Sequence, residues 1–129
     1  MPSRAQDWYG QARRDLEHAR ASLDNAHYDW VCFAAQQAAE KGLKALYQSL
    51  GAEARGPSVL GLLENLPQSL DPSPALIEAA KQLDKHYIPA RYPNSYPQGA
   101  PYEYYTGAEG ERALRHAELL LQFCQDHLV

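Results

Sequence analysis

Four prolines recur at every fourth position between Tyr87 and Tyr105, and this spacing excludes an α-helix there. Each proline also restricts the residue before it to extended geometry, which stiffens the chain. The same residues include six of the nine tyrosines and a single arginine, Arg91. Long irregular connections are usually functional or disordered, and disordered segments are poor in aromatic residues. We therefore expect residues 87–105, the Tyr/Pro segment, to be ordered and to hold functional residues.

The N-terminal half of the chain carries the apolar periodicity of α-helices. One helix is predicted over residues 5–24, and a longer one over about 27–50, with Gly51 as its C-terminal stop. The second helix is rich in alanine and glycine, which allows a neighbouring helix to approach closely. The predicted inward residues are Trp8, Ala12, Leu16, Ala19 and Leu23 in the first helix, and Val31, Ala35, Ala38, Gly42, Leu46 and Leu50 in the second.

Three further helices are predicted from capping and proline signals. A short helix starts at residues 56–58 and ends at Pro67, and the next has Ser73 as its N-cap. The last begins at a capping box over residues 106–109 and continues to the C-terminus. The predicted inward residues are Leu76, Ala79, Leu83 and Tyr87, and then Leu114, Ala117, Leu121, Cys124 and Leu128.

These elements predict an all-α fold, with no segment showing sustained strand alternation. We expect an up-and-down helical bundle of four main helices plus a short helix. The Tyr/Pro segment forms a long loop before the last helix. Residues 1–129 are expected to form a single helical domain.

Composition and charge exclude several classes of protein. The net charge of −4 has the wrong sign for a non-specific nucleic-acid binder, although a local basic patch is compatible with it. No signal peptide is visible, and no apolar run reaches the roughly 20 residues of a membrane-spanning helix, so we expect a cytoplasmic protein. Cys32 and Cys124 lie in helical patterns and are expected to be buried free thiols. No motif indicates a metal site, a phosphate-binding glycine loop or a cofactor.

Residues 30–47 read Trp-Val-Cys-Phe-Ala-Ala-Gln-Gln-Ala-Ala-Glu-Lys-Gly-Leu-Lys-Ala-Leu-Tyr and resemble the second helix of the HEPN family, with its Ala-Glu-Lys-x-x-Lys-Ala core. Residues 83–94, Leu-Asp-Lys-His-Tyr-Ile-Pro-Ala-Arg-Tyr-Pro-Asn, are similar to the family's segment before the final helix. The resemblance covers nearly the whole chain. It implies a dimeric helical bundle that often works beside a minimal nucleotidyltransferase. Many such pairs are toxin–antitoxin modules with the HEPN protein as the ribonuclease.

Family nucleases carry an Arg-x(4–6)-His motif near the start of the final helix, and Arg91 stands where the resemblance places the arginine. No histidine follows Arg91 at a permitted spacing. Tyr96 stands where a histidine would, and an ordinary tyrosine is a poor base at neutral pH. No catalytic residue is therefore assigned, and whether the chain is an enzyme stays open, with the balance toward a non-enzyme.

Arg91 is the first candidate for a phosphate or nucleotide contact, because a guanidinium suits bidentate phosphate binding. The alternative is that Arg91 stacks on a neighbouring tyrosine and braces the segment. The tyrosines are candidates for stacking on a base, or for packing the segment onto the bundle or a second copy. The candidate nucleotide- or RNA-binding residues are Arg91, Tyr92, Asn94, Tyr96, Lys41, Lys44 and His86.

The remaining candidates have equally plain structural alternatives. His86 is a substitute acid or base beside Arg91, or a surface histidine. Lys41 and Lys44 add positive charge to a groove with Arg91, or Lys44 simply pairs with Glu40 at i,i+4 spacing. His116, in the last helix, is interpreted as a surface residue.

The predicted function is that of a homodimeric HEPN-type protein that partners a minimal nucleotidyltransferase, as in a toxin–antitoxin module, and binds nucleotide or RNA near Arg91. Two alternatives stay open. One is a metal-independent ribonuclease toxin that uses Arg91 with a non-standard second residue, His86 or Tyr96. The other is a degenerate member whose Tyr/Pro segment only supports dimerisation. Neither a cofactor nor a membrane is expected to take part.

Overall fold

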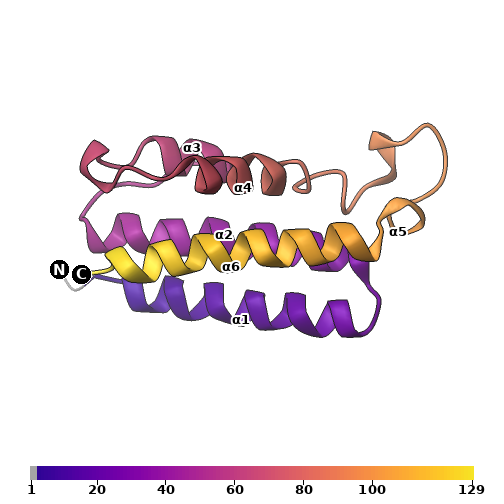
Figure 1. Cartoon of the computed structure of the whole chain (residues 1–129), viewed down its shortest axis with the longest axis horizontal. Coiled ribbons are helices and arrows are strands. Elements are labelled where there is room, and N and C mark those ends of the chain that lie inside the picture. The colour runs from indigo at the N-terminus through magenta and orange to yellow at the C-terminus, as the bar shows by residue number, and fades with distance from the viewer. Residues whose placement is uncertain (1–2) are drawn as a thin grey trace.

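The computed structural model describes residues 3–129, which fold as antiparallel and parallel helices in three layers (Figure 1). Helix α1 (Ala5–Asp24) forms one outer layer, and α2 (Tyr28–Ser49) and α6 (Gly107–His127) form the middle one. The other outer layer holds α3 (Val59–Glu64) and α4 (Pro74–Asp84). The all-α, up-and-down bundle of four main helices is therefore confirmed.

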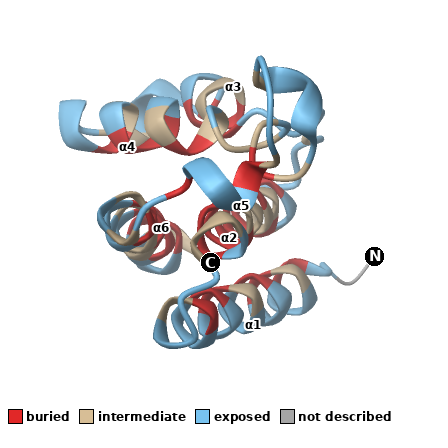
Figure 2. Ribbon diagram, turned by 90° about the vertical axis from the view of Figure 1, so that its right-hand side faces the viewer, coloured by how far each residue is buried: buried red, intermediate tan, exposed pale blue. Residues whose placement is uncertain are grey.

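Helix α2 is the central element, because it packs against α1, α6, α3 and α4. Small side chains make this possible, since most of the buried residues of α2 are small, alanine above all, and one is glycine. A methyl group added at Gly42 would lie 3.3 Å from Leu121 Cδ1 and 3.5 Å from Cys124 Sγ. Buried residues line the facing sides of the helices (Figure 2). The predicted close approach of a neighbouring helix to α2 is thus confirmed, and the neighbour is α6.

Six predicted inward residues are only partly buried or exposed: Trp8, Leu23, Leu50, Tyr87, Leu114 and Leu128. In α1 the core position is taken by Tyr9, 8% exposed, while Trp8 is only partly buried. The hydroxyl of Tyr9 reaches Gln125 Oε1 of α6 at 3.1 Å, so this ring spans the interface of two helices. Leu23 is likewise only partly buried. Leu50 is 39% exposed because α2 ends at Ser49 and the chain turns away from the bundle there.

The predicted helix starts are confirmed by their caps. The Ser58 hydroxyl accepts a hydrogen bond from Gly61 N at 3.0 Å, and Ser73 accepts from Leu76 N at 3.3 Å. At α6, Thr106 and Glu109 form the reciprocal capping box. The sequence did not predict the part of Asp84, whose carboxylate accepts from Val59 N at 2.7 Å and Leu60 N at 3.0 Å. This residue at the end of α4 therefore caps the N-terminus of α3.

The Tyr/Pro segment is more helical than predicted. It contains a 3₁₀ turn, η2 (Pro93–Ser95), and one turn of α-helix, α5 (Pro101–Tyr104). Another 3₁₀ turn, η1 (Gln68–Leu70), lies outside the segment, before α4. The exclusion of α-helix was wrong for the four residues of α5, because a proline in the first turn loses no hydrogen bond. The other prolines of the segment still prevent a longer α-helix.

Both cysteines are buried and unpaired, as predicted. Burial raises the pKa of Cys32 and of Cys124 to about 12, so both thiols stay protonated at neutral pH. Within residues 3–129 no helix is long and apolar enough to cross a membrane. The same residues contain no cluster of three or more His, Cys, Asp or Glu suited to a metal ion.

Candidate functional site

Hydrogen bonds and ring stacking within the Tyr/Pro segment fix its shape, while Ala90, Pro101 and Tyr105 are buried and anchor it to the bundle. The Tyr96 hydroxyl donates to Pro89 O at 3.1 Å, and the Tyr104 hydroxyl donates to Gln98 O at 2.6 Å. The rings of these two tyrosines stack, with centroids 4.4 Å apart and planes 15° apart. Gly99 permits the tight return of the chain because its φ is +80°. The segment projects from the end of the bundle opposite to the termini (Figure 1).

Arg91 is enclosed by aromatic rings. Its guanidinium carbon lies 4.2 Å from the ring centroid of Phe33 in α2, 4.9 Å from that of Tyr87 and 5.1 Å from that of Tyr92. Its Nε donates to Tyr87 O at 3.0 Å. No carboxylate within residues 3–129 forms an ion pair with it. Arg91 therefore does brace the segment, and its positive charge is still available for an anion.

The surface around Arg91 is aromatic and partly exposed. Tyr92 is 48% exposed, and so is Trp30, whose ring packs edge-on against Phe33 at 6.1 Å. Ile88, three residues before Arg91, is 42% exposed. We call these residues, together with Arg91 and Phe33, the aromatic face. It joins the start of α2 to the first half of the Tyr/Pro segment. Asn94, two residues after Tyr92, lies in η2 and is exposed.

His86 faces another direction, toward α6. Its Nδ1 lies 2.9 Å from the hydroxyl of the buried Tyr105, and the two ring centroids are 5.3 Å apart. Burial lowers the pKa of His86, which favours the neutral imidazole at pH 7. Within residues 3–129, no hydrogen bond or ring contact joins His86 to Arg91. The structure therefore does not bring this predicted pair together within one chain.

A cleft of about 380 Å³ lies beside His86, between the end of α4, the Tyr/Pro segment and the first half of α6. Tyr96 also lines it, so two of the predicted site residues meet here. Sequence reasoning missed three others, Lys85, Arg112 and His116. The i,i+4 spacing of Arg112 and His116 places both on one side of α6, but nothing in the sequence says what lies opposite. Burial also lowers the pKa of His116, which is partly buried and not simply a surface residue.

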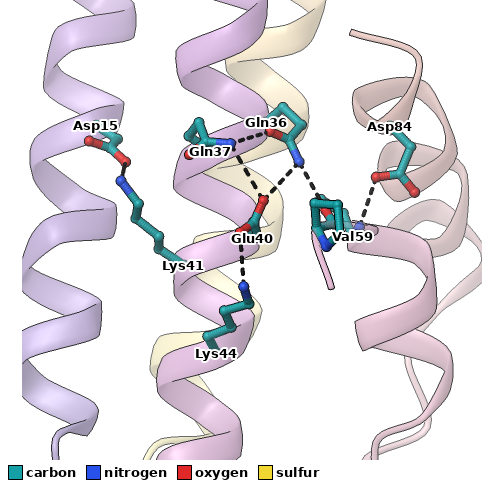
Figure 3. A network of polar contacts seen from close by, with 9 residues as sticks. Asp15, Gln36, Gln37, Glu40, Lys41, Lys44, Val59 and Asp84 are labelled. Carbon is teal, nitrogen blue, oxygen red and sulfur yellow. Dashed lines mark hydrogen bonds and ion pairs between the residues drawn. The ribbon is translucent and has the colours of Figure 1, made fainter. Parts of the chain in front are cut away.

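Lys41 and Lys44 belong to a different network (Figure 3). Lys41 Nζ lies 2.6 Å from Asp15 Oδ2 of α1, and Lys44 Nζ lies 3.0 Å from Glu40 Oε2. Gln36 connects this network to the loop before α3, since its amide donates to Glu40 at 3.3 Å and to Pro57 O at 3.0 Å. The predicted Glu40–Lys44 pair is therefore present, and both lysines have carboxylate partners away from Arg91.

Comparisons with known proteins agree with this architecture. The HEPN domain family matches residues 5–127. The Methanocaldococcus jannaschii protein named "Putative toxin MJ1304" is 30% identical over 127 residues, which cover 92% of this chain and 84% of that protein.

Solved structures give the same result. TT1696 from Thermus thermophilus is 49% identical with a TM-score of 0.96, covering 98% of this chain and 100% of that one. ST0689, described as an archaeal HEPN homologue, is 39% identical with a TM-score of 0.84, covering 100% of both chains. The HEPN domain protein TM0613 from Thermotoga maritima is 37% identical with a TM-score of 0.75, covering 93% of this chain and 95% of that one. With its fold, its second-helix motif and these matches, the chain belongs to the HEPN domain family.

Proposed function

We propose that this HEPN protein binds RNA or a nucleotide through Arg91 and its aromatic face. The observation that carries the proposal is the guanidinium held among three rings, with no carboxylate partner in the described chain. Three rings and the Nε bond to Tyr87 O restrict its position before any ligand arrives. A fixed cation loses little side-chain entropy when it binds a phosphate, which strengthens the contact.

The exposed rings complement that charge. Tyr92 and Trp30 each leave nearly half of their surface open, and such rings can stack on bases whatever the sequence. The chain as a whole carries a net charge of −4, so attraction to phosphate has to be local. Asn94, two residues after Tyr92 and exposed, adds an amide that can hydrogen-bond a base or ribose.

The biological setting that we propose is a toxin–antitoxin module. The M. jannaschii relative named "Putative toxin MJ1304" matches over most of both chains, and the family resemblance implies a minimal nucleotidyltransferase as the partner. In this proposal the protein acts as a homodimer, with the aromatic face at or near the interface between copies. Exposed tryptophan, tyrosine and isoleucine side chains of this face are compatible with such an interface, where aromatic residues are enriched.

Binding is favoured over cleavage. A ribonuclease needs an acid or base within reach of the phosphate that Arg91 holds. His86 is hydrogen-bonded to Tyr105 in the cleft, and the Tyr96 hydroxyl donates a hydrogen bond to Pro89 O. Burial also raises the pKa of Tyr96, so at neutral pH its hydroxyl stays protonated and cannot act as the base. The purely structural alternative, a degenerate dimerisation module, would need no free cation at position 91.

RNA and ATP binding to the full chain should be measured by calorimetry for the wild type and for Arg91→Ala. The matched control is Arg14→Ala, an exposed arginine in α1. We expect Arg91→Ala to weaken binding about ten- to hundredfold, because charge-assisted hydrogen bonds to phosphate are lost. If Arg91→Ala binds as tightly as Arg14→Ala and the wild type, Arg91 is excluded as the contact.

The partner and cleavage claims need separate tests. We expect a gene for a minimal nucleotidyltransferase beside the gene of this protein, and we expect the two proteins to co-purify as a complex. An unrelated neighbouring gene together with no transferase recovered would refute the pairing. RNA should also be incubated with the wild type and with Arg91→Ala. Cleavage by the wild type alone would restore the ribonuclease alternative.

The dimer is tested by light scattering of Trp30→Ala beside Leu119→Ala, a similarly exposed apolar side chain on α6.

A further inference from the structure

The cleft between α4, the Tyr/Pro segment and α6 contains side chains that the proposed function does not use. Lys85 and Arg112 line it, and neither forms an ion pair within residues 3–129. Its volume of about 380 Å³ falls within the range of small-molecule sites. Two unpaired cations at one cleft attract an anion, and a guanidinium can bind two phosphate oxygens at once.

Three carboxylates at or near the cleft already accept hydrogen bonds from neutral donors. Glu109 lines it, but its Oε1 accepts from Thr106 N at 3.1 Å and from Thr106 Oγ1 at 3.3 Å, as part of the α6 capping box. Glu78, the other carboxylate near His116, accepts from Gln82 at 3.2 Å. The Asp84 carboxylate accepts a hydrogen bond from Val59 N at the start of α3. Neutral donors do not remove the charge of a carboxylate, so Glu109 still contributes one negative charge to the lining. Lys85 and Arg112 contribute two positive charges, and the lining stays positive on balance.

The two histidines complete the polar lining. His86 is oriented by Tyr105, with 2.9 Å between Nδ1 and the hydroxyl oxygen. His116 is partly buried one helical turn after Arg112. Burial, more than any neighbouring charge, lowers the pKa of both histidines, and Arg112 adds a smaller contribution to each. Neutral imidazoles beside a cation are suitable hydrogen-bond donors to phosphate oxygens.

The lining of the cleft also includes tyrosine rings. Tyr104 stacks on Tyr96, and its hydroxyl is tied to Gln98 O, so the ring is fixed in position. It is nevertheless 41% exposed, which leaves ring surface for a second planar group. A rigid aromatic platform next to cations is the combination that holds a base and its phosphate.

We infer that this cleft is a second site, separate from Arg91, that binds a phosphate monoester attached to a nucleobase. Arg112 and Lys85 contact the phosphate, the histidines donate hydrogen bonds, and Tyr104 stacks on the base. Both a free mononucleotide and the phosphorylated end of an RNA strand offer this chemistry. The site does not depend on the Arg91 proposal.

The test uses the full-length chain with adenosine 5′-monophosphate, inorganic phosphate, and one short RNA with either a 5′-phosphate or a 5′-hydroxyl. Affinities are measured by calorimetry, and the imidazole signals of His86 and His116 are followed by NMR. The cleft variants are Arg112→Gln and Tyr104→Leu. The comparison variants are Arg91→Ala, at the other site, and Arg14→Gln on α1.

We expect Arg112→Gln and Tyr104→Leu each to weaken binding of the mononucleotide or of the 5′-phosphorylated RNA about tenfold or more. Arg14→Gln should leave that binding within about twofold of the wild type, and ligand should shift the signals of both histidines. In Arg91→Ala the ligand should still shift both histidine signals, whatever affinity the Arg91 site itself loses. Binding of the mononucleotide identifies a free nucleotide, and binding of the phosphorylated RNA alone identifies a strand end. Three results would overturn the inference: no binding of either at millimolar concentration, equal binding of inorganic phosphate, or loss of binding in Arg91→Ala but not in Arg112→Gln.

Discussion

The helical bundle and the Tyr/Pro segment are ordered by different interactions. In the bundle, α2 buries small side chains against α1 and α6, and the contacts join residues far apart in sequence. In the segment, few residues are buried in the core, among them Ala90 and Tyr105, and the hydrogen bonds join residues a few positions apart, such as Tyr96 to Pro89 and Tyr104 to Gln98. Apolar burial of many residues is cooperative, whereas a few local hydrogen bonds each contribute little.

This difference explains where the candidate sites lie. A residue in the close-packed bundle cannot change without a cost in stability, because the neighbouring helices cannot move apart freely. The segment and the cleft beside it present cations, histidines and tyrosines at the edge of that rigid scaffold. Binding residues on an irregular segment held against a rigid scaffold are common in proteins. The four predictions below separate the two regions, starting from the largest effect.

Leu46→Ala should show the cooperative character of the bundle. Leu46 is fully buried in α2, so truncation removes apolar contacts and leaves a cavity. We expect a loss of about 2–5 kcal/mol in the free energy of unfolding, measured by urea denaturation. The control is Leu119→Ala, since Leu119 is 44% exposed on α6, and its loss should be below about 0.5 kcal/mol. Similar losses in both variants would contradict the assigned core.

Asp84→Ala tests the contact between α3 and α4, at the border of the two regions. The change removes the acceptor for Val59 N and Leu60 N and so leaves these donors at the start of α3 unpaired. We expect a loss of about 1–2 kcal/mol by thermal unfolding. Asp84→Asn keeps a side-chain oxygen and should lose less. If both variants unfold like the wild type, the cap does not contribute to stability.

Tyr96→Phe should disturb the segment without disturbing the bundle. It removes one hydrogen bond, from the hydroxyl to Pro89 O, and retains the ring that stacks on Tyr104. We expect a loss of about 1 kcal/mol or less in global stability. Hydrogen exchange should become faster in residues 87–105 and stay unchanged in α2. Faster exchange throughout α2 would show that the two regions are not energetically separate.

The smallest effect concerns pH. Burial holds the pKa of His86 below its ordinary value of 6.5, while Glu109 opposes the shift and His116, Lys85 and Arg112 add to it. As pH falls through 6.5, the unfolded chain takes up a proton before the folded chain does. The free energy of unfolding contributed by His86 is therefore complete above about pH 6.5 and declines below it, until the folded pKa is passed.

His86→Gln removes this titration and should flatten the decline in stability between about pH 7 and pH 5, measured by urea denaturation at each pH. Because burial also lowers the pKa of His116, the double variant with His116→Gln should be flatter still. A decline as steep as in the wild type would show that neither histidine is linked to folding.

Local signals predicted the helices well. Ser58, Ser73 and Thr106 all cap the helices that they were expected to start. The errors came where local patterns compete. Trp8 and Tyr9 are neighbours with similar apolar character, and only packing against α6 decides that Tyr9 is the buried one. Pro101 was interpreted as a helix breaker, although a proline also starts the single turn of α5.

The sequence by itself determined the all-α fold and the family, and it identified Arg91 as a candidate site residue. Helix periodicity, caps and the HEPN motif are all local along the chain, so they can be recognised without the tertiary structure. Only the tertiary structure decided which candidates share a site. It placed Arg91 on Phe33 of α2, paired Lys41 with Asp15 of α1, and brought His86 into one cleft with Arg112 and His116 of α6. Such groupings depend on how helices distant in sequence pack together, and no local pattern of residues encodes that packing.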